Sequence, residues 1–202
     1  MKEFWDQRYS EPHYVYGEEP NEYFKAFLDA FQGKPGKLLL PGEGEGRNAV
    51  YAARLGWEVT AFDQSAEGRK KALQLAAKYG VSIQYEVCDV MDFPFEEGSF
   101  DLAGMFFFHL PRALRDYTHP KLVGALRPGG MLVAELFTPR QLGKTSGGPQ
   151  TTELLYEPED LRREFQTLDI VLLEELNIEL NEGPHHQGEA SVVRLVGVKG
   201  EE

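Results

Sequence analysis

This 202-residue chain contains a single cysteine, has a negative net charge and lacks long apolar runs. The single cysteine, Cys88, excludes an internal disulfide and favours a cytoplasmic protein. The net charge of −12 argues against nucleic acid as a partner, because that binding depends on Lys and Arg neutralising phosphates. No apolar run approaches the roughly 18 residues of a membrane span, and the polar, aromatic N-terminus lacks the apolar core of a signal peptide.

The remaining composition, 42% hydrophobic and 27% charged, is typical of a globular protein. Its length suits one well-buried domain, so we expect a single domain over residues 1–202. Residues 1–33 are expected to form an N-terminal arm followed by a helix. Pro20 and Asn21 open that helix, because the apolar residues after them recur at helical spacing until Gly33.

Strands and helices alternate through the middle of the chain. Apolar runs predict strands at 37–40, 57–62, 82–87, 100–107 and 131–137. Helical spacing predicts helices at 49–55, 66–79, 111–126 and 159–165. The sequence RPGG predicts a turn immediately before the last of those strands. The alternation implies right-handed crossovers and a doubly wound, mainly parallel sheet with helices on both faces.

The end of the chain departs from this alternation. Residues 170–180 and 191–198 have the pattern of two long strands, and only NEGPHHQGEA separates them. That connection is too short for a crossover helix, so the two strands should pair as an antiparallel hairpin. The expected fold class is therefore α/β: a Rossmann-like, mainly parallel sheet that ends in a C-terminal antiparallel hairpin.

The strongest candidate binding motif is the glycine-rich turn after residues 37–40. Gly42, Gly44 and Gly46 form G-x-G-x-G, whereas the dinucleotide fingerprint would require a glycine in place of Arg47. Asp63 ends the next strand, where a carboxylate can accept both hydroxyls of a ribose. The turn and the acid suit an adenosine-like ligand. Alternatively, the glycines serve only the backbone geometry of a tight turn.

The acidic residues around this turn narrow the ligand further. Glu43 and Glu45 would repel a pyrophosphate, whereas a ligand with a positive centre and an ammonium group would tolerate them. Asp89 directly follows strand 82–87, at the edge where open α/β sheets bind ligands. It can accept the exocyclic amine of adenine or, alternatively, act as a helix cap or loop acid. Cys88 has no activating partner visible in the sequence, so we interpret it as a small buried residue.

These motifs, together with FDLAGMFFFHLP and LRPGGMLVAELF, resemble those of class I S-adenosylmethionine-dependent methyltransferases. GEGEGRNAVYAARLGWEVTAFDQS, YVYGEEPNEYF and EGPHHQGEASVVRLVGVK are similar to the small enzymes of the tellurite-resistance type. The resemblance covers nearly the whole chain and implies the seven-stranded methyltransferase fold with S-adenosylmethionine as cofactor. It implies these cofactor-binding residues: Gly42, Glu43, Gly44, Gly46, Asn48, Asp63, Gln64, Asp89, Val90 and Tyr16.

One position departs from the family pattern. Those enzymes commonly carry an acid at the end of the first strand, where this sequence has Leu40. Either Glu43 holds the cofactor ammonium instead, or backbone carbonyls hold it alone. The aromatic N-terminal segment either packs as an ordered arm or forms a lid over the cofactor, with Tyr14 or Tyr16 near the sulfonium.

The acceptor side offers fewer candidates. A thiolate or chalcogen oxyanion would need no general base, unlike an alcohol or an amine. His109 follows strand 100–107 and Arg140 lies in the long loop 139–152, so both are candidate acceptor-binding residues, although each can equally be structural. His185 and His186 make a poor zinc site, so no metal is expected, and we interpret them as loop residues at the mouth of the acceptor site.

The leading hypothesis is a cytoplasmic methyltransferase that acts on a small molecule with a soft or anionic nucleophile, with neither nucleic acid nor membrane as partner. A non-catalytic S-adenosylmethionine-binding protein is the alternative. A nicotinamide-dependent oxidoreductase is disfavoured by the missing third glycine, the two glutamates and the terminal hairpin.

Overall fold

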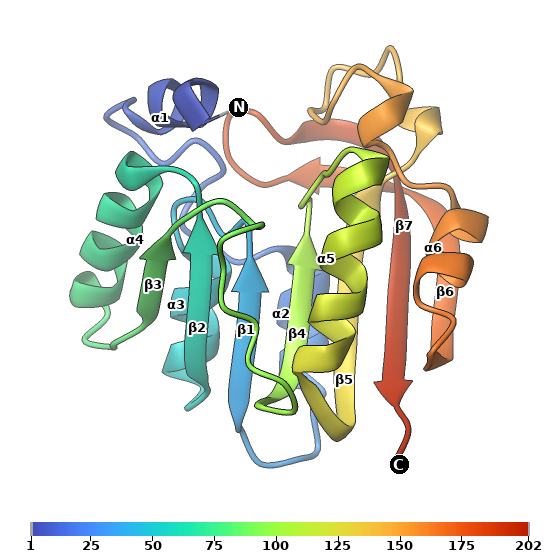
Figure 1. Cartoon of the computed structure of the whole chain (residues 1–202). Coiled ribbons are helices and arrows are strands. Elements are labelled where there is room, and N and C mark those ends of the chain that lie inside the picture. Colours follow the sequence, from blue (N-terminus) through green and yellow to red (C-terminus); the bar gives the residue numbers. More distant parts are fainter. Residues whose placement is uncertain (1, 202) are drawn as a thin grey trace. The chain divides into compact units, whose positions relative to one another are not determined.

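A computed structural model of the protein describes residues 2–201 (Figure 1). The helices are α1 Lys2–Tyr9, α2 Glu22–Asp29, α3 Arg47–Arg54, α4 Ala66–Lys78, α5 Arg112–Ala125 and α6 Pro158–Glu164, with short 3-10 turns at Pro139–Gln141 and Thr152–Leu154. The strands are β1 Lys37–Pro41, β2 Glu58–Asp63, β3 Gln84–Val87, β4 Phe100–Phe106, β5 Leu126–Phe137, β6 Leu168–Asn181 and β7 Gln187–Lys199.

These strands are ordered β3-β2-β1-β4-β5-β7-β6 in a seven-stranded sheet. The pairs β1–β2, β2–β3 and β4–β5 are parallel, whereas β7 runs antiparallel to both β5 and β6. The predicted fold class, a mainly parallel sheet that ends in an antiparallel hairpin, is therefore confirmed.

Contacts between Cα atoms divide the chain into two compact units. The first unit holds the described residues up to Phe93 together with Glu182–His185, the tip of the β6–β7 hairpin. The second unit holds Pro94–Asn181 and the described residues from His186 onward. All ten predicted cofactor-binding residues fall in the first unit, and the predicted acceptor residues His109 and Arg140 fall in the second.

The first unit places its polar residues at one edge of the sheet. Leu38, Leu39 and Leu40 of β1 are fully buried, as expected for a parallel strand covered on both faces. The parallel register sets Pro41 of β1 opposite Phe62, and it sets Asp63 of β2 opposite Val87. The glycine turn, Asp63 and the residues after β3 therefore all follow the carboxyl ends of neighbouring strands.

Side-chain caps begin two of the helices in this unit. Asn21 caps α2, since its Oδ1 accepts a 2.9 Å hydrogen bond from the Phe24 amide. Ser65 caps α4 in the same way, accepting from the Gly68 amide at 3.1 Å. The helix predicted to begin at Pro20-Asn21 is confirmed, whereas the helical form of α1 is a feature that the sequence pattern did not predict.

The second unit differs from the prediction at the RPGG segment. A turn was expected before a strand beginning at Met131, but β5 already begins at Leu126. Along β4, the partner shifts from Leu126, opposite Phe100, to Met131, opposite Leu102. The RPGG residues are therefore an irregular insertion within the strand, where Gly129 adopts a positive φ of 72°.

Among residues 2–201, no helix combines the length and apolar character needed to cross a bilayer.

Candidate functional site

The glycine turn requires glycine at all three of its positions. Gly42, Gly44 and Gly46 have φ values of +62°, +58° and +85°, which L side chains rarely adopt. A Cβ atom on Gly46 would lie 2.5 Å from the Cβ of Ala72, on α4. Gly46 therefore permits the close packing of α3 against α4. In the dinucleotide fingerprint, the third glycine serves the comparable close packing of a helix against a strand.

Arg47 consequently has a different role. Its side chain is buried, and its Nη2 lies 2.6 Å from the Oε2 of Glu182 on the hairpin tip. Its Nη1 also donates to the carbonyls of Tyr16 and Glu19, at 3.3 and 3.4 Å. Arg47 thus ties the hairpin tip and the N-terminal arm to the first residue of α3.

Asp63 lies directly beside the glycine turn. Its Oδ2 accepts a 3.1 Å hydrogen bond from the Gly44 amide, and its Oδ1 accepts one of 2.9 Å from the Ser65 amide. Burial raises the pKa of this carboxyl from 3.8 to about 6. Each oxygen retains further acceptor capacity, so the carboxylate is positioned by the backbone and can still receive ribose hydroxyls.

The segment after β3 reaches the same edge. The Cys88 amide donates to the carbonyl of Asp63 at 3.0 Å, which joins the ends of β2 and β3. Asp89 is exposed, with one carboxylate oxygen on the Met91 amide at 3.0 Å, while Val90 is buried and Gln64 half-buried. Burial and the carboxylate of Glu86 raise the pKa of the Cys88 thiol to about 11, so this thiol is a weak nucleophile at neutral pH.

The two glutamates of the turn have different roles. The Oε1 of Glu43 accepts a 2.6 Å hydrogen bond from the Ala49 amide in the first turn of α3, and burial raises the pKa of this carboxyl from 4.5 to about 7. The carboxylate of Glu45 instead lies 2.7 Å from the Lys71 ammonium and accepts from the Val15 amide at 2.8 Å. Glu45 is therefore held against the arm by a buried cation, whereas Glu43 is held by the first turn of α3.

Three other predicted residues make hydrogen bonds within the protein. The Asn48 Oδ1 accepts from the Asn21 amide at 2.8 Å. The Tyr14 hydroxyl donates to the Lys71 carbonyl at 3.1 Å. Tyr16 is half-buried and hydrogen-bonds Arg8, and burial raises the pKa of its phenol. Cofactor contacts of Asn48, Tyr14 and Tyr16 remain predictions.

The aromatic residue beside the glycine turn is Tyr9, which sequence reasoning did not single out. A Cβ atom on Gly44 would lie 2.5 Å from the Tyr9 hydroxyl oxygen. From the core side, the Tyr85 hydroxyl donates to the Gly44 carbonyl at 2.6 Å. The available signal was the unusually aromatic arm, FWDQRY, although its spacing does not show which ring reaches the turn.

Asp6 holds α1 over this region. Its Oδ1 accepts from the Ser65 hydroxyl at 2.7 Å and from the Ala66 amide at 3.0 Å, at the N-terminal end of α4. The hydrogen bond from Ser65 is the main cause of the lowered pKa of this carboxyl. Figure 1 shows α1 lying across that end of α4. The first unit thus covers its glycine turn with its own N-terminal helix.

In the second unit, His109 is a neutral imidazole. Its Nδ1 lies 2.7 Å from the Leu154 carbonyl, which can only accept, so Nδ1 carries the proton. The buried Nε2 has no hydrogen-bond partner within residues 2–201. Burial lowers the pKa of this side chain from 6.5 to about 3.

Aromatic rings surround this histidine. His109 stacks on Phe137, with ring centroids 5.5 Å apart, and Phe137 stacks in turn on Phe107 at 4.4 Å. The edge of His186 meets Phe107 at 4.7 Å. Phe107 adopts a φ of +52°, a strained conformation that is common at functional sites. Arg140, by contrast, is exposed and lies 3.3 Å from the Glu175 carboxylate.

Within the described part of the chain, no three His, Cys, Asp or Glu side chains gather as a possible metal site. Residues 39–130 match the family model of a methyltransferase domain. The chain carries a class I S-adenosylmethionine-dependent methyltransferase domain. The matched stretch contains the glycine turn, Asp63 and Asp89, and the cofactor of this domain is S-adenosylmethionine.

No curated protein matches the chain in sequence. Solved structures match it in fold. A protein from "Conversion of a Disulfide Bond into a Thioacetal Group during Echinomycin Biosynthesis" has a TM-score of 0.82 at 19% identity, over 100% of this chain and 93% of its own. TehB from Haemophilus influenzae has a TM-score of 0.73 at 15% identity, over 98% of this chain and 66% of its own.

A third match is 1,6-didemethyltoxoflavin-N1-methyltransferase from Burkholderia thailandensis, with 1,6-didemethyltoxoflavin and S-adenosylhomocysteine bound. Its TM-score is 0.64 at 22% identity, over 89% of this chain and 77% of its own. At these identities the likeness concerns the fold, and the acceptor has to be argued from the residues of this chain.

Proposed function

We propose that the protein transfers the methyl group of S-adenosylmethionine to a small acceptor with a soft or anionic nucleophile, such as a thiol or a chalcogen oxyanion. The observation that carries this choice is His109. A histidine with a pKa of about 3 is a poor base at neutral pH, whereas a thiolate or oxyanion requires no proton removal. The structural neighbour from echinomycin biosynthesis, where a disulfide bond is converted into a thioacetal group, supports a sulfur acceptor.

The proposed contacts with the cofactor follow from the geometry of the first unit. The Asp63 carboxylate receives the ribose hydroxyls, and the exposed Asp89 receives the adenine amine. Glu43 or the backbone carbonyls of the turn receive the cofactor ammonium in place of the acid absent at Leu40. The remaining proposed cofactor contacts are Gly42, Gly44, Gly46, Asn48, Gln64, Val90 and Tyr16.

In the proposed reaction, a lone pair of the acceptor attacks the sulfonium methyl carbon in line with the bond to sulfur. The new bond to the acceptor forms as the carbon–sulfur bond breaks, and S-adenosylhomocysteine leaves with the electron pair. The work of the protein is alignment and exclusion of water, an effect of roughly 7–11 kcal/mol in favourable cases. We propose that the unpartnered Nε2 of His109 orients the acceptor without removing a proton. Arg140 stays a weaker candidate, because Glu175 already pairs with it.

We also propose that residues 1–202 act as one methyltransferase domain, with residues 1–33 as its lid. A non-catalytic cofactor-binding protein is the second candidate. A methyl transfer that needs no general base requires few catalytic residues, so the residues present do not distinguish an enzyme from a binding protein.

The test is a methyl-transfer assay with thiols, selenite, tellurite, catechols, amines and RNA as acceptors, alongside calorimetry with S-adenosylhomocysteine. We expect turnover with a thiol or a chalcogen oxyanion. His109→Ala should lower that turnover and leave the dissociation constant of S-adenosylhomocysteine unchanged. Turnover confined to RNA or amines would refute the acceptor class, and cofactor binding without any turnover would favour the non-catalytic candidate.

A further inference from the structure

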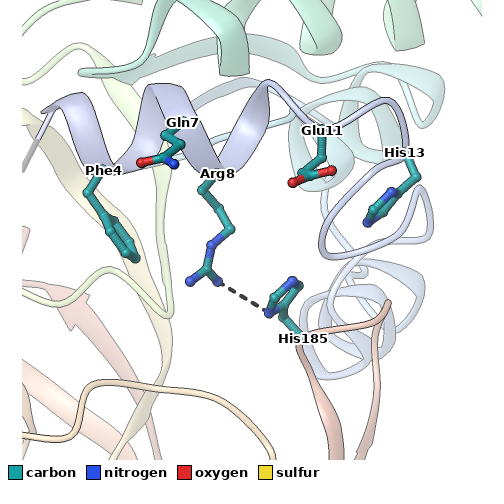
Figure 2. A pocket seen from close by; sticks show the side chains of 6 residues that line it. All are labelled: Phe4, Gln7, Arg8, Glu11, His13 and His185. Carbon is teal, nitrogen blue, oxygen red and sulfur yellow. Dashed lines mark hydrogen bonds between the residues drawn. The ribbon is translucent and has the colours of Figure 1, made fainter.

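A pocket of about 440 Å³ lies within the first unit, between the N-terminal arm and the hairpin tip. Phe4, Gln7 and Arg8 line it from α1, while Glu11 and His13 line it from the loop that follows. His185 of the hairpin tip completes the wall, and Figure 2 shows its ring directed at the Arg8 guanidinium. None of these residues belongs to the cofactor contacts proposed above.

Arg8 differs from the other cations that join this unit together. Arg47 and Lys71 each pair with a buried glutamate. Within residues 2–201, by contrast, no carboxylate lies at ion-pair distance from the Arg8 guanidinium. That group instead donates to the Nδ1 of His185 at 3.3 Å, hydrogen-bonds Tyr16 and lies 4.9 Å from the centre of the Phe4 ring. A guanidinium has five donors in a fork that matches an oxyanion, so most of this capacity remains for a ligand.

His185 adds a second donor to the pocket, and protonation would give its ring a positive charge and a further N–H group. Arg8 can only donate, so the Nδ1 of His185 accepts and the neutral ring carries its proton on Nε2. Burial, followed by Arg8 and His13, lowers the pKa of His185, while Glu11 and Glu45 oppose that shift. An anion in the pocket would favour the protonated ring. Proton uptake at His185 should therefore accompany anion binding.

We propose that this pocket binds an oxyanion group of the methyl acceptor, held by Arg8 and by His185 in its protonated form. The part of this inference that identifies the ligand as the acceptor rests on the proposed function, whereas anion binding itself does not. A carboxylate on an organic molecule and an inorganic oxyanion offer the same oxygen atoms to Arg8. The Phe4 ring is 52% exposed beside the guanidinium and provides an apolar wall for the body of an organic acid.

Arg8, and not Arg140, is then the cation that recognises the anion. The N-terminal arm and the hairpin tip each supply one donor to the anion, Arg8 from the arm and His185 from the tip. The Gly183 backbone packs so tightly against that of Tyr16 and Gly17 that a Cβ atom on Gly183 would overlap both. This contact keeps His185 within reach of Arg8.

The test is an NMR titration of the His13 and His185 ring resonances with sodium benzoate or sodium selenite, in the absence of cofactor. His185→Gln assigns the resonances. We expect the pKa of His185 to rise when the anion binds, and the affinity to increase as the pH falls. Arg8→Gln should weaken binding about tenfold or more, the usual effect of losing a charge-assisted hydrogen bond. Arg162→Gln, which removes an exposed arginine of α6 from outside the pocket, should leave binding unchanged.

The two probes distinguish the sources of the oxyanion. Tighter binding of benzoate assigns the pocket to an organic acid, and tighter binding of selenite assigns it to an inorganic oxyanion; either result supports the site. Equal binding to the wild type and to Arg8→Gln, with both folded by circular dichroism, would overturn it. So would displacement of the anion by S-adenosylhomocysteine, because the pocket would then belong to the cofactor.

Kinetics separate this inference from the proposed function. With an active acceptor, Arg8→Gln should raise the KM of the acceptor about tenfold and leave the dissociation constant of the cofactor unchanged. Failure to find turnover would refute the proposed function without affecting the anion titration. Failure of the anion titration would refute the pocket without affecting turnover.

Discussion

The hydroxyl oxygen of Tyr9 lies 2.5 Å from the position that a Cβ atom on Gly44 would occupy. The amide of the same glycine donates to Asp63, and its carbonyl accepts from Tyr85. Gly44 is therefore enclosed by the arm on one side and, on the other, by the end of β2 and a side chain of β3. A change at Gly44 should consequently affect the cradle and the seating of α1 together.

We expect Gly44→Ala to lower the free energy of unfolding by about 2 kcal/mol or more and to weaken binding of S-adenosylhomocysteine. A positive φ strains any L residue by roughly 1–3 kcal/mol, and the added methyl group would also displace Tyr9. Denaturant unfolding and calorimetry would measure the two effects.

Gly80→Ala is the matched control for this variant. Gly80 has a similar φ of +65° in the same unit, but a Cβ atom there would meet nothing within 4 Å. It should therefore show the backbone strain alone and bind the cofactor normally. Combining Gly44→Ala with Tyr9→Ala should be less costly than the sum of the two single changes. Equal effects of Gly44→Ala and Gly80→Ala would show that Tyr9 does not close over the turn.

Asp63→Ala should weaken binding of S-adenosylmethionine by about 1.5–3 kcal/mol, the usual loss for hydrogen bonds to a charged group. Calorimetry would measure this change. A dissociation constant within twofold of the wild-type value would remove Asp63 from the cofactor site.

The pH dependence of binding tests the same carboxylate. Ribose hydroxyls donate to the ionised form, and the pKa of Asp63 is about 6, so the affinity should fall as the pH drops through 6. The limiting slope is about tenfold per pH unit. Asp63→Asn should abolish this fall, whereas Asp92→Asn, at an exposed acid in the loop after β3, should preserve it.

Glu43 should make the fold less stable as the pH rises towards neutrality. The pKa of its carboxyl, about 7, lies above the usual 4.5, so the folded state binds the proton more tightly than the unfolded state. The resulting stabilisation is complete below pH 4.5 and is lost as the pH rises through 7. Thermal melting at pH 5 and pH 7.5 should show a smaller difference for Glu43→Gln than for the wild type. The exposed Glu58→Gln should behave as the wild type, and an unchanged difference in Glu43→Gln would contradict the assignment.

Glu182→Gln should lower the free energy of unfolding by about 3–5 kcal/mol, because it leaves the buried Arg47 without its countercharge. Replacing both partners, with Arg47→Met and Glu182→Leu, should cost less than the two single changes together.

An exposed ion pair supplies the comparison. Asp101→Asn breaks the contact of Asp101 with Arg127, whose side chain is 53% exposed, and should cost less than about 1 kcal/mol. Denaturant unfolding of both variants would measure the contrast. Similar costs for Glu182→Gln and Asp101→Asn would show that the hairpin tip is not held by this buried pair.

The sheet was predictable because apolar or alternating strand segments recur between helical segments along the chain. β1 has a continuous run of buried leucines, and β6 and β7 alternate on either side of a connection too short for a helix. The glycine turn and Asp63 were predictable for a related reason. A turn with positive φ demands glycine, and parallel strands bring their carboxyl ends to one edge.

The arm was predictable only as aromatic and ordered. α1 has eight residues and no clear apolar face, so its helical form depends on tertiary contacts of Asp6 and Tyr9. The RPGG segment was predicted as a turn, but it lies within β5, because the residues on either side of it pair with β4. A local sequence pattern does not contain that pairing.

The sequence by itself determined the order of the elements, the glycine turn and the acids after β2 and β3, because these depend on local periodicity and backbone geometry. Only the tertiary structure decided where the charges point. Glu45 pairs with Lys71, and Arg47 pairs with Glu182, which is 135 residues away in the sequence. Arg8 donates a hydrogen bond to His185, which is 177 residues away. Such pairings depend on which segments, distant in sequence, the fold brings together. A buried charge needs a partner of opposite charge or a hydrogen bond, and the packing decides which residue supplies it.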